Sequence, residues 1–234
     1  MNLFFLQVII DSAKIKDSLA KVAMMAAQQK ESLFDILAKG GPLMIPLAIL
    51  LVIAIFVFFE RYIAIKKASK LDDNFMNIIR DHIVSGNVIA ARSLAKNTDS
   101  AVARMIDKGL QRVGKKIEAI DHSMENVATL ELYKMEKNLS VLSVIGYIAP
   151  LFGFLGTIAG MLQLFYSIAS TGEYSISAIA GGIYVKMISS ASGLIIGIIA
   201  YVGYRFLISQ VDRATHKMES ASADFIDILE APTS

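Results

Sequence analysis

The sequence predicts an all-helical membrane protein with three transmembrane helices, the second and third of which extend into a cytoplasmic helical bundle. First, 55% of the 234 residues are hydrophobic and the mean hydropathy is +0.55, yet 19% are charged, so part of the chain lies in lipid and part in water. Second, the hydrophobic residues gather into three long runs. Third, no Gly or Pro occurs from Ile117 to Leu139, so a helix can enter the second run without a break.

The three runs are long enough to cross a bilayer. The first, residues 42–59, is entirely apolar and gives about 27 Å of helix. The second, residues 139–169, carries no charge and extends about 46 Å, so it protrudes beyond the hydrocarbon core. The third, residues 174–204, contains Lys186 as its single charge.

The distribution of Lys and Arg predicts the orientation of these spans. The segment between the first two spans, 61–138, holds 14 of them, whereas the short connection 168–175 holds none. Basic residues favour the cytoplasmic side, so the long segment and the 205–234 tail are expected inside and the N-terminus outside. The chain is therefore expected to be a multi-pass membrane protein with its termini on opposite sides.

The regions outside the spans are also expected to be helical. Residues 1–40 alternate apolar and charged positions at helical spacing, which is typical of an amphipathic helix at a membrane surface. In the cytoplasmic segment, breaks at 85–87 and 97–100 predict helices over 72–83, 88–95 and 101–114. A further helix from about residue 116 should run into the second span as one continuous rod. The tail is expected to prolong the third span in the same way.

Composition excludes several functions. A net charge of +2 without a basic patch argues against a nucleic-acid partner, and the absence of cysteine removes disulfides and thiolate chemistry. The histidines His82, His122 and His216 lack ligand spacing. No nucleotide loop or metal motif is present, so we expect neither an enzyme nor a bound cofactor.

Small and polar residues form one stripe along each of the last two spans. Steps of three and four residues place them on a single helix face. The second-span stripe comprises Ser143, Gly146, Pro150, Gly153, Thr157 and Gly160; the third-span stripe comprises Gly182, Lys186, Ser189, Gly193 and Gly197, with Ser190 and Ser192 beside it.

Two interpretations of these stripes remain open. Small residues allow membrane helices to pack closely, and packing alone could explain the glycines. The number of hydroxyl groups instead favours a hydrated or partner-facing lumen, and Lys186 supports it because a charge within a span usually faces a cavity or a counter-charge. The alternative for Lys186 is snorkelling of its ammonium to the outer surface. Pro150 frees the carbonyl of Gly146 and is expected to kink or hydrate its helix.

No span contains Asp, Glu or His, so none can carry a proton through an ordinary titration. If protons move along this chain, a partner must supply the carboxylate. That condition separates the chain from a self-sufficient transporter, which would carry its own ionisable binding site.

The segment APLFGFLGTIAGMLQLF at 149–165 resembles the second-span signature of the MotA/TolQ/ExbB proton-channel family. SAVARMIDKGL at 100–110, Glu131, and SSASGLIIGIIAYVGY at 189–204 agree in order, as does the Glu60–Arg61 end of the first span. The resemblance covers about residues 40–225. Three spans with the large segment after the first resemble ExbB and TolQ.

The resemblance implies a homopentamer in which the second and third spans surround single helices of ExbD-type subunits that carry an intramembrane Asp. It assigns Thr157 and Ser190 to the ion path, lined further by Ser189, Lys186, Gly153, Gly160, Gly193 and Pro150. Val185 occupies a position where part of the family has glutamate, which leaves the identity of the ion open.

The function implied is that of a pore-forming subunit in a motor driven by the proton-motive force, which works through a TonB-type transducer on outer-membrane transport. The resemblance also implies the bacterial inner membrane as its location, with the N-terminus in the periplasm and the C-terminus in the cytoplasm. A TolQ-like or gliding-type motor role, and a membrane scaffold that conducts nothing, are the alternatives.

Overall fold

The computed structural model describes residues 40–172 and 175–230, and within them every regular element is a helix. The amphipathic helix predicted over residues 1–40 lies outside this part of the chain except for its last residue. The helices are α3 (Met44–Ser69), α4 (Phe75–Val84), α5 (Val88–Asn97), α6 (Ala101–Leu110), α7 (Ile117–Glu136), α8 (Leu139–Thr171) and α9 (Ile176–Glu230).

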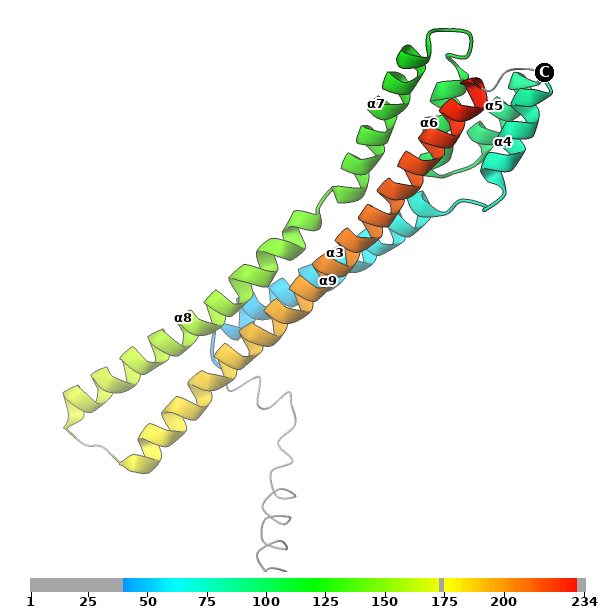
Figure 1. The fold of residues 1–234 in the computed structure, drawn as a ribbon. Coiled ribbons are helices and arrows are strands. Elements are labelled where there is room, and N and C mark those ends of the chain that lie inside the picture. The colour runs from blue at the N-terminus through cyan, green and yellow to red at the C-terminus, as the bar shows by residue number, and fades with distance from the viewer. Residues whose placement is uncertain (1–39, 173–174, 231–234) are drawn as a thin grey trace, which may run out of the picture.

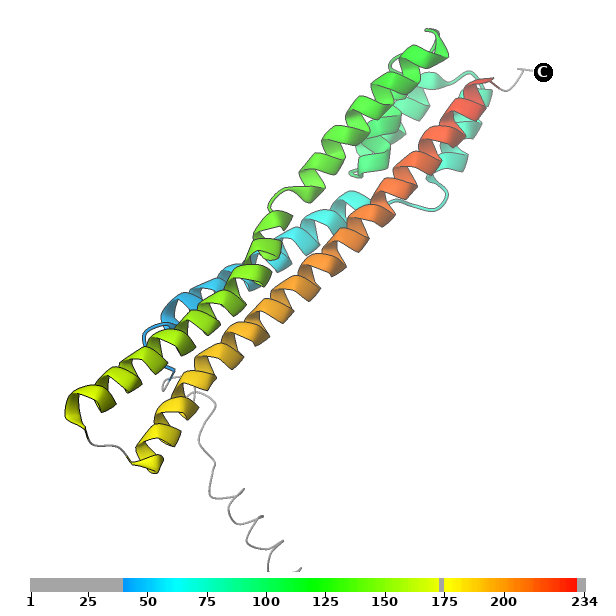
Figure 2. The same ribbon diagram turned by 60° about the vertical axis from the view of Figure 1, so that its left-hand side comes forward.

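Three long rods determine the shape of the molecule. α8 and α9 form an antiparallel hairpin, and α3 packs along one side of it (Figure 1). The short helices α4, α5 and α6 gather against the end of α9 that carries the C-terminus, on the same side as α3 (Figure 2). In the described residues, three helical stretches are long and apolar enough to cross a membrane, and they lie in α3, in α7 with α8, and in α9. The predicted fold class is confirmed.

The α8–α9 hairpin depends on glycine at its contact points. A Cβ atom added to Gly193 would lie 2.5 Å from the carbonyl oxygen of Ala149 and 2.9 Å from the Cα of Gly153. One added to Gly197 would lie 2.6 Å from the ring of Pro150. Real side chains do not tolerate these distances, so the two backbones touch only because the Cβ atoms are missing.

The rod predicted from residue 116 into the second span is interrupted. α7 ends at Glu136 and α8 begins at Leu139, because Asn138 adopts a left-handed conformation with φ of 64°. Asn tolerates this conformation better than most residues, and neither Gly nor Pro was needed to break the helix. The absence of Gly and Pro was therefore an insufficient criterion for continuity.

Arg61 satisfies the helix end that this break creates. Its Nη1 donates to the carbonyl oxygens of Lys134 (3.3 Å) and Lys137 (3.1 Å), which lie at the C-terminal end of α7. The Arg61 side chain also pairs with Glu60 and is only 9% exposed. α3 thus extends beyond its apolar part and joins the hairpin where α7 meets α8.

Helices α5 and α6 begin at polar caps. The side chains of Asn87 and Ser100 each accept a hydrogen bond from a backbone N–H three residues on, at 3.1 Å, which satisfies a donor at the start of α5 and of α6. α6 ends at Leu110, four residues earlier than predicted, and the chain turns through Gly114 at φ of 90°. The core here includes Ile106, Met124 and Phe225.

We predict that Gly193→Ala destabilises the hairpin. The added methyl group would meet backbone atoms of α8, which cannot move away as a flexible side chain can, so α8 and α9 must separate. Thermal unfolding in detergent should show a clear decrease in Tm. The matched control is Gly181→Ala, where nothing lies within 4 Å of the added atom. That variant should retain or slightly raise Tm because Ala favours helix by up to about 1 kcal/mol; equal effects of the two substitutions would contradict the packing described.

We predict that Arg61→Met destabilises the fold by about 1–3 kcal/mol, because the Lys134 and Lys137 carbonyl oxygens lose their donor in a part-buried position. Denaturant unfolding of the purified chain measures this change. Arg80→Met removes the same side chain from an exposed site on α4 and should have little effect. A stability loss shared by both variants would remove the special role of Arg61.

Candidate functional site

Two hydroxyl groups converge on one backbone carbonyl inside the hairpin. The Oγ of Ser189 donates to the carbonyl oxygen of Lys186 at 2.9 Å. The Oγ1 of Thr157, across the seam on α8, lies 3.3 Å from the same oxygen and 3.3 Å from the carbonyl oxygen of Gly153. A threonine has one hydroxyl hydrogen, so it donates to one of these at a time and its lone pairs stay available as acceptors.

The two predicted ion-path hydroxyls differ from Ser189 in their exposure. Ser189 is 1% exposed and lies in the seam, whereas Thr157 and Ser190 are half-buried. A Cβ atom on Gly153 would lie 2.8 Å from the Ser189 carbonyl oxygen and 3.0 Å from the Ser190 Cα. Ser189 therefore belongs to the helix contact, and Thr157 and Ser190 remain accessible to a further helix.

Lys186 lies across the hairpin rather than away from it. The carbon atoms of its side chain occupy the space that a Cβ of Gly160 would need. Gly160 thus forms a notch that receives the aliphatic part of Lys186, about one helical turn from Thr157. The side chain is half-buried in a span that carries no other charge.

Pro150 does not interrupt α8. The helix continues through it for its full 33 residues, and Gly197 on α9 leaves room for the proline ring. The carbonyl oxygen of Gly146, freed by Pro150, lies 2.9 Å from the position of a Gly197 Cβ. This carbonyl therefore faces the neighbouring helix.

The structure brings all eight predicted site residues to one region of the hairpin but divides them by role. Gly153, Gly160, Gly193 and Pro150 serve the contact between α8 and α9. Around them the described residues of the spans hold no acid. No three His, Asp or Glu side chains come together as metal ligands anywhere in residues 40–172 and 175–230.

Sequence reasoning missed an ion-pair network at the end of α3. Glu131 on α7, whose side chain is 3% exposed, receives Arg104 at 2.6 Å and Lys134 at 2.7 Å. Arg104 also pairs with Asp99 at 2.7 Å, and Asp99 pairs with Lys67 of α3 at 2.9 Å. The network connects α3, α6 and α7 through residues up to 67 positions apart, a relation that no local pattern reveals.

Burial by itself raises the pKa of Glu131, but the hydrogen bonds from Arg104 and Lys134 outweigh it and hold the pKa below its usual range. The hydrogen bond from Lys67, aided by its charge, likewise lowers the pKa of Asp99. Both acids are therefore ionised at neutral pH in the folded chain.

We predict that Glu131→Gln lowers the stability at neutral pH by about 1–3 kcal/mol, because two cations lose their buried counter-charge. The folded-state pKa is depressed, so the carboxylate stabilises the fold above the unfolded-state pKa and loses this effect as pH falls through the folded-state value. Unfolding measured across pH should show wild type and variant converging in acid. Glu136→Gln, an exposed control on the same helix, should follow wild type; a pH-independent gap between wild type and Glu131→Gln would contradict the assignment.

Fold and site together define a multi-pass membrane protein whose last two spans form a closely packed hairpin with a hydroxyl-lined edge and no carboxylate. The model of the MotA/TolQ/ExbB proton channel family matches residues 97–220, more than half of the chain. The chain belongs to this family, which comprises channels and not enzymes.

Curated relatives agree with this membership. The ExbB-like 1 biopolymer transport protein of Synechocystis is 29% identical over 185 residues, 77% of this chain and 72% of that one. The biopolymer transport protein exbB1 of Vibrio cholerae is 35% identical over 88 residues, 37% of this chain and 39% of that one. ExbB of Xanthomonas campestris is 29% identical over 112 residues, 48% and 44% of the respective chains.

Proposed function

We propose that the chain is an ExbB-like pore-forming subunit of an inner-membrane motor driven by the proton-motive force. As a homopentamer it surrounds ExbD-type single-span helices and, through a TonB-type transducer, energises outer-membrane transport. One observation carries the proposal: a half-buried Thr157 and Ser190 border a seam that contains no Asp, Glu or His to carry a proton by an ordinary titration.

The chemistry of the seam fits a partner's carboxylic acid. The hydrogen of the Thr157 hydroxyl is directed to backbone carbonyls, so its oxygen is free to accept a hydrogen bond from a protonated acid. An ionised carboxylate instead needs donors or a positive charge, and Lys186 provides an ammonium about one turn away. The hairpin can therefore host both states of an aspartate that it does not itself possess.

In this mechanism the partner's aspartate takes up a proton on the periplasmic side and releases it toward the cytoplasm as it passes Thr157 and Ser190 of successive subunits. Each charge that crosses a 100 mV potential supplies about 2.3 kcal/mol. This energy drives rotation of the inner helices relative to the ring. The orientation follows the positive-inside rule, with the N-terminus periplasmic and α4 to α7 in the cytoplasm.

A non-conducting scaffold is the competing function, and the glycine seam favours it. Gly153, Gly160 and Gly193 all have a packing role that needs no ion flow. A scaffold requires the size of Thr157 and Ser190 but not their hydroxyl groups. TolQ-like and gliding-type motors share the pore chemistry and differ in the protein that they drive.

We predict that Thr157→Val abolishes at least nine-tenths of the proton flux into liposomes that contain the chain and its single-span partner. Valine keeps the shape of threonine but cannot accept a hydrogen bond from the aspartic acid. Thr157→Ser, which keeps the hydroxyl, should retain most of the flux. Flux is read from a pH-sensitive dye after a potential is imposed.

The Tm of the Thr157→Val complex serves as the control for assembly. Undiminished flux in this variant, with Tm unchanged, would remove Thr157 from the ion path. Loss of flux in Thr157→Val together with full flux in Thr157→Ser would exclude the scaffold.

A further inference from the structure

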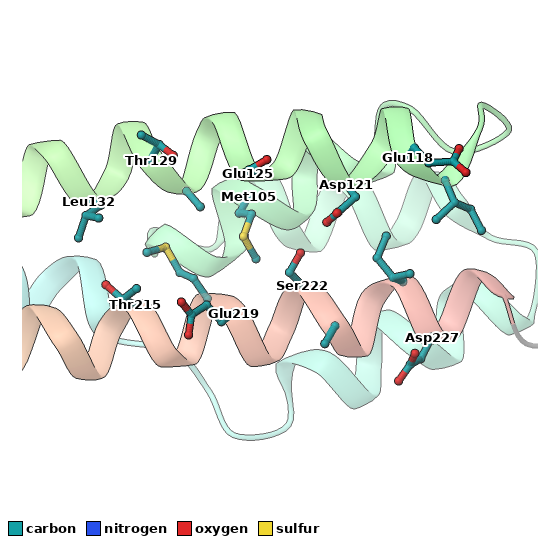
Figure 3. A pocket seen from close by; sticks show the side chains of 15 residues that line it. Met105, Glu118, Asp121, Glu125, Thr129, Leu132, Thr215, Glu219, Ser222 and Asp227 are labelled. Carbon is teal, nitrogen blue, oxygen red and sulfur yellow. The ribbon is translucent and has the colours of Figure 1, made fainter.

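An acidic groove with an apolar floor lies between α7 and α9, outside the membrane-crossing parts of both helices. Its volume is about 820 Å³. Figure 3 shows its two walls, with Glu118, Asp121 and Glu125 on α7 and Glu219 and Asp227 on α9. None of the 15 residues that line it is Lys or Arg.

The floor of the groove is suited to a side chain or helix from outside. Its apolar lining includes the buried Met105 of α6 and Met218 of α9 together with Leu132 and Ile226. Methionine adapts its shape to different apolar partners at little cost. The lining runs from Ile117 to Leu132, about 22 Å of helix, which accommodates about 14 residues of a helical segment.

The groove opens on the same side of the molecule as the face of α8 and α9 that α3 does not cover, which we call the free face of the hairpin. α6 closes the groove from behind, and α6 and α3 lie on the same side of the α7–α9 pair (Figures 1, 2 and 3). The mouth of the groove therefore continues the face of α8 and α9 that α3 leaves uncovered. A helix packed on that face within the membrane would emerge next to the groove.

We propose that this groove binds the Lys- and Arg-rich cytoplasmic segment of the single-span helix that fills the pore. The proposal rests on the proposed function, because it assumes a partner helix on the free face of the hairpin. Whichever end of a single-span helix lies in the cytoplasm, the flank on that side is enriched in basic residues by the positive-inside rule. Five carboxylates over an apolar floor complement such a segment in charge and in amphipathic character.

The test uses the full-length chain in phosphatidylcholine nanodiscs, with empty nanodiscs as the blank. The probe is a fluorescein-labelled 14-residue helical peptide with four Lys on one face and Ala and Leu on the other. We expect its anisotropy to report binding that weakens as salt rises from 50 to 500 mM. The same peptide with Glu in place of Lys should not bind.

Groove variants locate the binding. The combined Asp121→Asn, Glu125→Gln and Glu219→Gln variant should bind the peptide at least tenfold more weakly than wild type. The matched control neutralises three exposed acids outside the groove, Asp73→Asn, Asp81→Asn and Asp224→Asn, and should bind as wild type does. Equal binding by wild type and the groove variant, or no binding by wild type, overturns the proposal.

Cross-linking provides a second reading that does not depend on the stability of the triple variant. The chain has no cysteine, so Ser222→Cys places a single thiol in the groove and Ser220→Cys places one on an exposed site outside it. A cysteine-to-lysine cross-linker should join the peptide to the first variant and not to the second. Cross-links from Ser222→Cys to a second copy of the chain, undiminished by peptide, would show that neighbouring copies fill the groove and would overturn the proposal.

The outcome can be separated from that of the proposed function. Thr157→Val should lose proton flux but bind the peptide normally, since it lies in the membrane part of the hairpin. If flux survives Thr157→Val while the groove variants still lose the peptide, the ion path fails and the groove assignment stands.

Discussion

The contact between α8 and α9 is the constraint on which the rest of the structure depends. Where Gly193 meets the backbone of Gly153 and Ala149, the helices lie too close for any side chain to stand between them. That proximity brings Thr157 within reach of the Lys186 carbonyl, buries Ser189 and directs the Lys186 side chain into the notch at Gly160. The position of the hydroxyl groups at the edge of the hairpin thus follows from helix packing. The stripes contain two kinds of residue: the glycines form the helix contact, and Thr157 and Ser190 lie at its accessible edge.

The spans and most helices could be predicted because their signals are local. Hydrophobic runs give the spans, and the caps at Asn87 and Ser100 give the start of α5 and of α6. The break at Asn138 could not be predicted in this way, since asparagine also occurs within helices. The carbonyl groups of Lys134 and Lys137 beside the break find their donor in Arg61, which lies 73 and 76 residues away. The network around Glu131 and the acidic groove were missed for the same reason, because their residues meet only in the folded chain.

The hairpin changes character along its length. In the membrane part of the hairpin, α8 and α9 touch through glycine. Outside the membrane, where α7 replaces α8, helix α6 packs behind α7 and α9, and Met124 and Phe225 belong to the core there. A Cβ on Gly109 of α6 would lie 2.5 Å from the Met124 sulfur and 2.7 Å from the Phe225 ring, so α6 itself packs closely here. The result is a narrow half in lipid, where Lys186 is the one charged residue, and a wider half whose acids either pair with Lys and Arg, as at Glu131, or line the groove.

The two arms of the hairpin differ as mechanical elements. α9 is one helix of 55 residues, about 82 Å, so a single unbroken ladder of backbone hydrogen bonds joins its membrane end to its C-terminal end. The other arm has a joint at Lys137 and Asn138, where no continuous ladder of hydrogen bonds crosses from α7 to α8. Arg61 links that joint to α3, because its side chain donates hydrogen bonds to the carbonyl oxygens of Lys134 and Lys137. A rotation of α9 about its axis would therefore be carried along its whole length by one helix, whereas a rotation of α8 would reach α7 only through the two residues that link them.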